Sequence, residues 1–182
     1  RRWHISLNQL RTKVPMDELS TIAAVATPRG EGGIAVIRVS GPHAFAAAEP
    51  ILRGAPRPGD MPPRTLVRAD IYDEKRCIDQ AVVAVFRAPR SYTGEDIVEI
   101  SCHGSPYISR IILELLFRNG ARPAEPGEFT RRAFLNGKMD LAQAEAVADI
   151  IRAKTESARR VSMAHLQGGL SRTLETIRSR LI

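Results

Sequence analysis

Cysteine is scarce in this chain of 182 residues, and long apolar runs are missing from it. The two cysteines, Cys77 and Cys102, lie far apart, which excludes a disulfide framework and a cysteine-based metal site. No apolar run approaches the roughly 18 residues that a membrane-spanning helix needs. These absences favour a soluble protein of a reducing, cytoplasmic compartment with no membrane partner.

A phosphate-binding loop of the P-loop type is also missing. No G-x-x-x-x-G-K-[ST] motif occurs, because Lys138 is followed by Met139 and Arg132 stands where the first glycine would be. This segment therefore cannot bind nucleotide phosphates by a P-loop, and it is not itself a GTPase.

Catalytic and metal-binding clusters are absent from the pattern as well. Cys102 and His103 are adjacent, but neighbours in a strand point to opposite faces, which disfavours a thiolate–imidazole pair. The remaining histidines are scattered: His4, His43 and His165. We expect no catalytic residue and no metal site in this segment.

Positive charge is concentrated at the two ends of the chain, which has 27 Lys and Arg against 20 Asp and Glu. Residues 1–15 hold four basic and no acidic residues, and residues 152–182 hold seven basic and two acidic. The remainder, residues 16–151, holds 16 basic against 18 acidic residues, which argues against a basic groove across it. The basic rear segment is either a solvated helix face or a nucleic-acid contact, and the sequence leaves both open.

Residues 1–18 are expected to form an extension outside the fold. The first fifteen contain no acid and precede Met16, which is typical of an upstream or added segment. A transit peptide is the alternative, because such segments are Arg-rich and poor in acids.

Residues 19–137 predict one α+β domain with a mixed sheet. Apolar runs bounded by turn residues predict its strands, and an Ala-rich run and a Ser105-Pro106 start predict its helices. The expected strands are 21–27, 34–40, 66–72, 81–86 and one from 97 to about 103, and the expected helices are 43–52 and 106–118.

Residues 138–182 predict the first helices of a second, helical domain, with 126–149 as the joint. A short helix is expected over 127–135, and Asp140 with Gln143 has the form of a capping box before the next helix. A later apolar stripe, which Gly168-Gly169 weakens or bends, comprises Leu166, Leu170, Leu174, Ile177 and Leu181. These helices lack partners for their apolar faces, so we expect a truncated bundle.

Three charged residues stand out as candidate ligand contacts. Arg38 and Glu99 each lie within an apolar strand, and the pattern supports a buried ion pair and a ligand site equally. Lys138 follows Asn136-Gly137, where a solvated turn lysine is the simpler interpretation.

Three long blocks of the sequence resemble the tRNA modification GTPase family MnmE, also called TrmE. The resemblance runs from about Thr21 to Gly169, and its blocks are TIAAVATPRGEGGIAVIRVSG, SYTGEDIVEISCHG and PGEFTRRAFLNGKMDLAQAEAVADII. It implies a folate-binding domain similar to that of the glycine-cleavage aminomethyltransferase, followed by a helical domain into which a G domain is inserted.

The resemblance also implies partners and cofactors. Family members form homodimers through the N-terminal domain. They act with the flavin-dependent partner MnmG (GidA) on the wobble uridine of tRNA and take a one-carbon unit from a tetrahydrofolate such as 5-formyltetrahydrofolate. GTP, potassium and magnesium belong to the G domain, which this chain lacks.

The family's folate contacts correspond by motif to Arg38, Glu99 and Lys138. A carboxylate such as Glu99 can accept two hydrogen bonds from the pterin edge, and the two cations suit the folate's carboxylates or carbonyl. One departure is Ser105, where the family has a second glycine after the histidine. The rival functions are a stand-alone folate-dependent one-carbon transferase and a dimerisation scaffold that binds no folate.

Overall fold

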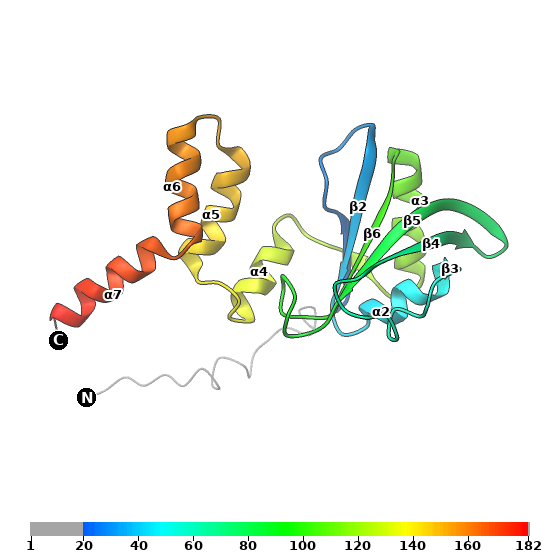
Figure 1. Ribbon diagram of the computed structural model, residues 1–182, viewed down its shortest axis with the longest axis horizontal. Coiled ribbons are helices and arrows are strands. Elements are labelled where there is room, and N and C mark those ends of the chain that lie inside the picture. Colours follow the sequence, from blue (N-terminus) through cyan, green and yellow to red (C-terminus); the bar gives the residue numbers. More distant parts are fainter. Residues whose placement is uncertain (1–19, 182) are drawn as a thin grey trace. The chain divides into compact units, whose positions relative to one another are not determined.

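The computed structural model describes residues 20–181, which form two compact units (Figure 1). The first comprises residues 20–91 and 95–124, and the second comprises 92–94 and 125–181. The predicted extension at 1–18 lies outside the described residues. The predicted domain boundary after residue 137 falls within the second unit, because the helix before it contacts the helix after it.

The first unit is built on one seven-stranded sheet in the order β3-β4-β5-β6-β2-β1-β7. Neighbouring strands are antiparallel, except that β1 and β7 pair in parallel. The strands are β1 Ile22–Val25, β2 Gly32–Ser40, β3 Leu52–Arg53, β4 Leu66–Asp73, β5 Arg76–Phe86, β6 Ile97–Gly104 and β7 Arg122–Pro123. The five predicted strands are confirmed, and the two-residue strands β3 and β7 carry no pattern by which they could be predicted.

Helices α2 (Ala44–Ala48) and α3 (Pro106–Arg118) cover one face of this sheet (Figure 1). Strand residues that alternate toward the helices are apolar, and burying them drives the packing. Fully buried members of this core include Ile37, Val39, Val83, Val98, Ile100, Ile112 and Leu116. The predicted helix over 43–52 is too long: a 3-10 turn, η3 (Glu49–Ile51), follows Ala48, and Leu52 already begins β3.

The junction between β6 and α3 explains how serine is accommodated at position 105. Ser105 is the predicted N-cap, has extended backbone angles (φ −101°, ψ 126°) open to any residue, and makes no side-chain capping bond. Gly104 is different, because a Cβ there would lie 2.4 Å from the carbonyl oxygen of Gly32. The close approach of two strands therefore requires glycine at 104 and not at 105.

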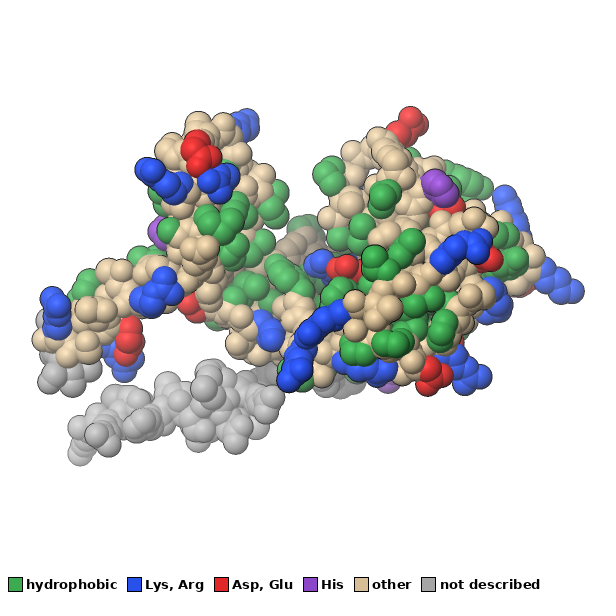
Figure 2. Space-filling model, in the orientation of Figure 1, with side chains coloured by type: hydrophobic (Ala, Val, Ile, Leu, Met, Phe, Trp, Pro, Cys, Tyr) green, Lys and Arg blue, Asp and Glu red, His purple; other side chains and the backbone are tan. Residues whose placement is uncertain are grey.

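The opposite face of the sheet carries alternating polar and apolar side chains, and no described helix of the first unit packs on it. Ile34, Leu66 and Val82 lie exposed on this face beside charged residues. Figure 2 shows green hydrophobic side chains interspersed with blue and red ones over the first unit.

The second unit consists of four helices: α4 (Glu128–Leu135), α5 (Leu141–Arg152), α6 (Glu156–Leu166) and α7 (Gly169–Leu181). The capping box that was predicted at the start of α5 is confirmed. Asp140 accepts a hydrogen bond from the Gln143 backbone N–H at 2.8 Å, and the Gln143 side chain accepts one from the Asp140 N–H at 2.9 Å.

The predicted apolar stripe from Leu166 to Leu181 is divided between two helices, at the Gly168-Gly169 position where a weakening or bend was expected. Leu166 ends α6, and Gly168, with φ +77°, turns the chain so that α7 starts a new helix. The left-handed conformation is one that glycine adopts without steric cost. Taken together, the mixed sheet with its helices and the following helical segment confirm the α+β class. None of the helices described here is long and apolar enough to cross a membrane.

Candidate functional site

Arg38 and Glu99 lie side by side on the uncovered face of the sheet. They are register partners in the antiparallel pair β2 and β6, so their side chains leave the sheet in the same direction. The Glu99 Oε1 atom accepts from the Arg38 Nε at 2.8 Å and lies 2.7 Å from Nη2. Both contacts fall on one oxygen, which leaves Oε2 able to accept from another donor.

Small residues flank this pair on the neighbouring strands. Ala24 of β1 is the register partner of Arg38, and Ala84 of β5 is the register partner of Glu99. Four neighbouring strands therefore carry one row of side chains, in the order Ala-Arg-Glu-Ala. The alanine side chains at its two ends are too short to cover the charged pair between them. The side chains of Arg38 and Glu99 keep 24% and 25% of their surface exposed. From the sequence, a buried ion pair and a ligand site were equally supported. In the structure the pair is half-buried and accessible from one side.

Local periodicity explains why the chain places charges here. Residues 37 and 39 of β2, and 98 and 100 of β6, point into the apolar core, so the residues between them point outward. A charged side chain in a strand of this kind keeps contact with water without breaking the core.

Hydrogen bonds connect the turn before β6 to the end of β2, close to the Arg38–Glu99 pair. Ser40, at the end of β2, donates its hydroxyl to Glu95 Oε2 at 2.7 Å, and the Gly41 N–H donates to the Asp96 carbonyl at 3.1 Å. Glu95 was not among the predicted site residues. It directly follows the turn at Thr93-Gly94, and this position is the signal that could have indicated it.

Lys138, the third candidate, belongs to the second unit, and its backbone is held there by the end of α4. Its N–H donates to the Ala133 carbonyl at 2.8 Å after Gly137, which has φ +67°. Its side-chain stem packs against Gly94, where a Cβ would lie 3.3 Å from Lys138 Cγ and Cδ. The structure thus brings Arg38 and Glu99 together and holds Lys138 within the other unit.

Residues 92–94 also anchor this lysine turn by hydrogen bonds within the second unit. The Asn136 amide donates to the Thr93 carbonyl at 2.7 Å, and the hydroxyls of Tyr92 and Thr130 lie 2.8 Å apart. The block that contains Glu99 therefore contributes residues 92–94 to the second unit and its other residues to the first.

Cys102 and His103 lie on opposite faces of β6, as the strand alternation predicts. Cys102 is buried and its thiol lies 3.5 Å from the Ala35 carbonyl, whereas His103 is exposed on the other face. Burial raises the pKa of the Cys102 thiol, and the charge of Asp79 raises it further. His103 instead contacts Asp79, with its Nδ1 2.6 Å from Oδ1. That partner comes from β5, so only the strand register could reveal it.

Metal binding finds no support in the part of the chain that the structure describes, where no cluster of three or more His, Cys, Asp or Glu could hold an ion. The arrangement around Glu99 suits an organic ligand instead. An accessible carboxylate beside a guanidinium offers an acceptor for N–H groups and a donor fork for oxygens on one surface.

Comparison with known proteins is consistent across the chain. Residues 21–138 match the family described as GTP-binding protein TrmE N-terminus, and residues 141–182 match the MnmE helical domain. The tRNA modification GTPase MnmE of Lactococcus lactis is 48% identical over 165 residues, which are 91% of this chain and 36% of that protein. Its namesake in Christiangramia forsetii is 48% identical over 164 residues, covering 89% and 35%.

The tRNA modification GTPase MnmE of Thermotoga petrophila is 46% identical over 164 residues, covering 90% of this chain and 36% of that protein. The chain thus spans about a third of the length of these relatives, all named tRNA modification GTPase. With both its sheet-containing and its helical parts matched in order, the chain belongs to the MnmE (TrmE) family.

Proposed function

We propose that this chain is the part of a tRNA-modifying GTPase that binds a one-carbon tetrahydrofolate, with Arg38, Glu99 and Lys138 as ligand contacts. The observation that carries the proposal is the accessible Arg38–Glu99 pair on the uncovered sheet face. The family membership supports it, because these residues occupy the family's folate motifs.

Glu99 is assigned to the pterin edge, whose ring N–H and amino group form a pair of parallel donors. Oε1 is already bonded to Arg38, and Oε2 is oriented by that same bond. A fixed carboxylate loses less side-chain entropy when it binds a ligand. Arg38 therefore orients the carboxylate that binds the pterin, and it can also donate a hydrogen bond to a folate oxygen. Lys138 supplies a second positive charge for the folate's carbonyl or carboxylates.

The remaining parts of the proposal concern the whole protein. We assign to it a homodimer formed through the N-terminal domain, the flavin-dependent partner MnmG, and 5-carboxymethylaminomethyl modification of the wobble uridine in tRNA. GTP hydrolysis, with potassium and magnesium, is assigned to a G domain outside this chain, and the location is proposed to be the cytoplasm.

Calorimetric titration with 5-formyltetrahydrofolate tests the ligand site. Glu99→Gln keeps the shape of the side chain but replaces one acceptor oxygen with a donor amide, so we expect affinity to fall about 10- to 100-fold. The matched control is Asp70→Asn, which neutralises a carboxylate paired with Arg68 at 3.2 Å on β4 of the same sheet.

The control should bind folate as the unsubstituted chain does. Unchanged affinity in Glu99→Gln would remove Glu99 from the site. Absence of saturable heat in the unsubstituted chain would favour the dimerisation scaffold that binds no folate.

A further inference from the structure

A second candidate ligand site lies at the end of β5, and its lining includes none of the proposed folate contacts. It is a hollow of about 180 Å³ lined by Pro63, Arg64, Arg87, Ala88, Pro89 and Arg90. Half of these residues are arginines and none is acidic. We call this hollow the arginine pocket.

Arg87 is held rigidly as one wall of the arginine pocket. Its guanidinium lies over the Phe45 ring of α2, 5.3 Å from the ring centroid. Nη2 donates to the carbonyl oxygens of Gly59 and Met61, the latter at 3.4 Å. Arginine stacked on a ring and bonded through one edge is oriented in advance and keeps other N–H groups for a ligand.

Arg64 and Arg90 are exposed, and their side chains have no hydrogen-bond or ion-pair partner among residues 20–181. Their backbones, by contrast, are fixed. The Arg64 N–H donates to the Val85 carbonyl at 2.8 Å, and the Arg90 N–H donates to the Arg87 carbonyl at 2.8 Å. Arg64 also has φ +63°, a conformation that is uncommon for any residue except glycine and that is often found at functional sites.

The charge of the arginine pocket is not neutralised by its own lining. Asp96 is nearby and accepts a hydrogen bond from the Ala88 N–H at 2.9 Å, but it does not line the hollow. Three like charges around one hollow repel one another, and an anion between them removes that repulsion. The basic cluster is distinctive because residues 16–151 are slightly acidic as a whole.

We propose that the arginine pocket binds a backbone phosphate of RNA. Guanidinium forks match the oxygens of a phosphate, and three forks can reach different oxygens of one tetrahedral group. The lining offers no free aromatic face and no carboxylate to recognise a base, since Phe45 is already covered by Arg87. Contact of this kind positions RNA without reading its sequence. The choice of RNA rests on the proposed function, in which the whole protein acts on tRNA.

The test is fluorescence anisotropy of an unmodified, labelled tRNA transcript against this chain at several salt concentrations. Arg64→Gln/Arg90→Gln removes two charges that form no hydrogen bond or ion pair among residues 20–181, so stability should be retained. We expect weaker binding and a slope of log affinity against log salt that is smaller by about one.

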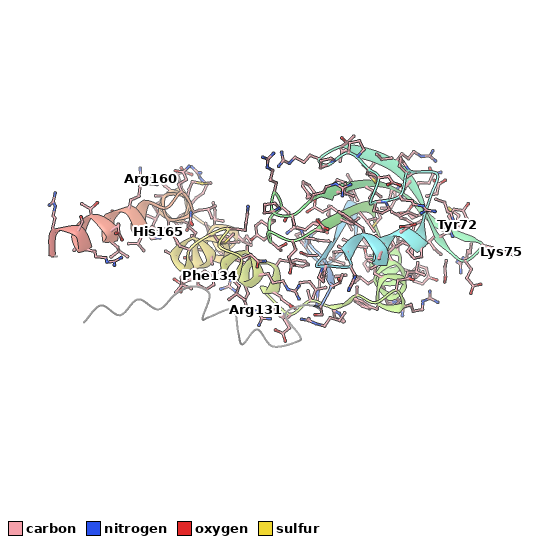
Figure 3. The ribbon with its side chains drawn as sticks, turned by 90° about the horizontal axis from the view of Figure 1, so that it is seen from below. Tyr72, Lys75, Arg131, Phe134, Arg160 and His165 are labelled. Atoms are coloured by element: carbon pink, nitrogen blue, oxygen red, sulfur yellow. The ribbon has the colours of Figure 1, made fainter. Side chains whose placement is uncertain are left out.

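The matched control is Lys75→Gln/Arg76→Gln, which removes the same charge at the other end of β5, where Lys75 marks the hairpin tip (Figure 3). Its salt slope should be unchanged. Equal losses in both double variants, or no RNA binding by the unsubstituted chain, would overturn the proposal.

Two further titrations, with inorganic phosphate and with folate, complete the experiment. If calorimetry shows phosphate binding that the Arg64/Arg90 variant loses while its RNA affinity stays unchanged, the pocket takes free phosphate and the RNA proposal is wrong. Folate binding measured on the same samples separates the two hypotheses: loss of RNA binding with intact folate binding leaves the proposed function standing.

Discussion

The first unit buries branched aliphatic side chains between a sheet and two helices, whereas the largest buried side chains of the second unit are a charged pair, Glu128 and Arg132. The second unit otherwise buries small residues such as Ala133 and Ala146, and it leaves many large apolar ones exposed. These exposed side chains include Leu141, Ile151, Val161, Leu174 and Ile177.

This contrast indicates different sources of stability. Apolar burial supports the first unit, at roughly 25 cal/mol for each Å² removed from water. The second unit depends more on directed polar contacts, namely caps, a salt bridge and side-chain bonds between helices. We therefore expect single polar substitutions to damage the second unit and single apolar truncations to damage the first.

The largest effect is expected from Glu128→Ala. The Glu128 side chain is 0% exposed, and its Oε1 lies 3.0 Å from Arg132 Nη2, whose own side chain is 3% exposed. Removing the acid leaves a buried guanidinium without its carboxylate, which typically costs about 3–5 kcal/mol. Hydrogen exchange should show lost protection in α4 and α5, with protection in α3 unchanged.

The double variant Glu128→Leu/Arg132→Met is the control for that experiment. It removes both charges while keeping apolar volume, so it should recover most of the lost stability. Equal damage in the single and double variants would mean that shape, and not charge pairing, holds α4.

A somewhat smaller effect is expected from Ile37→Ala in the core of the first unit. Ile37 is fully buried and is the register partner of Ile100, so truncation leaves a cavity and should cost about 2–5 kcal/mol. Urea unfolding followed by hydrogen exchange on the strands measures it.

Ile34→Ala is the matched control on the same strand. Ile34 is 67% exposed, and its truncation should change stability by less than about 0.5 kcal/mol. Comparable losses at both positions would contradict the view that this unit depends on its buried face.

The smallest effect is expected from Asp140→Ala, at about 1 kcal/mol for a lost N-cap at neutral pH. The hydroxyl of Ser171, 2.6 Å from Oδ2, and the Gln143 N–H lower the pKa of the Asp140 carboxyl below its ordinary 3.8. A lowered pKa in the folded state contributes stability that is present above the ordinary pKa and is lost as pH falls through the lowered value. The difference between variant and unsubstituted chain should therefore shrink in acid.

Helical circular dichroism during thermal unfolding, from neutral pH to below pH 3.8, measures this difference. Asp149→Ala removes an exposed acid from the same helix and should show no such pH-dependent loss. A constant difference for Asp140→Ala at every pH would show that its charge makes no contribution.

The sequence predicted those features whose causes are local. The apolar runs around Ile37 and Ile100 located the strands that carry Arg38 and Glu99, and the spacing of Asp140 and Gln143 located a cap. The Arg38–Glu99 contact itself depends on the register between two strands 61 residues apart, which no local pattern contains.

The features that were missed depend on tertiary packing. Glu128 and Arg132 were not singled out from the sequence, in which only their spacing of four residues indicates a pair. The arginine pocket joins Arg64 to Arg87 and Arg90 through the bond from the Arg64 N–H to the Val85 carbonyl, so composition alone could not locate it.

The row of Ala24, Arg38, Glu99 and Ala84 has a further consequence that concerns the local dielectric. The attraction between two charges grows as water is displaced from around them. The alanines at both ends leave the pair open to water on its outer side, so any flat group that covers the row would lower the dielectric there. Such a group would strengthen the Arg38–Glu99 ion pair beneath it. The strengthened pair would then add to the affinity for the ligand, beyond the direct contacts between the pair and the ligand.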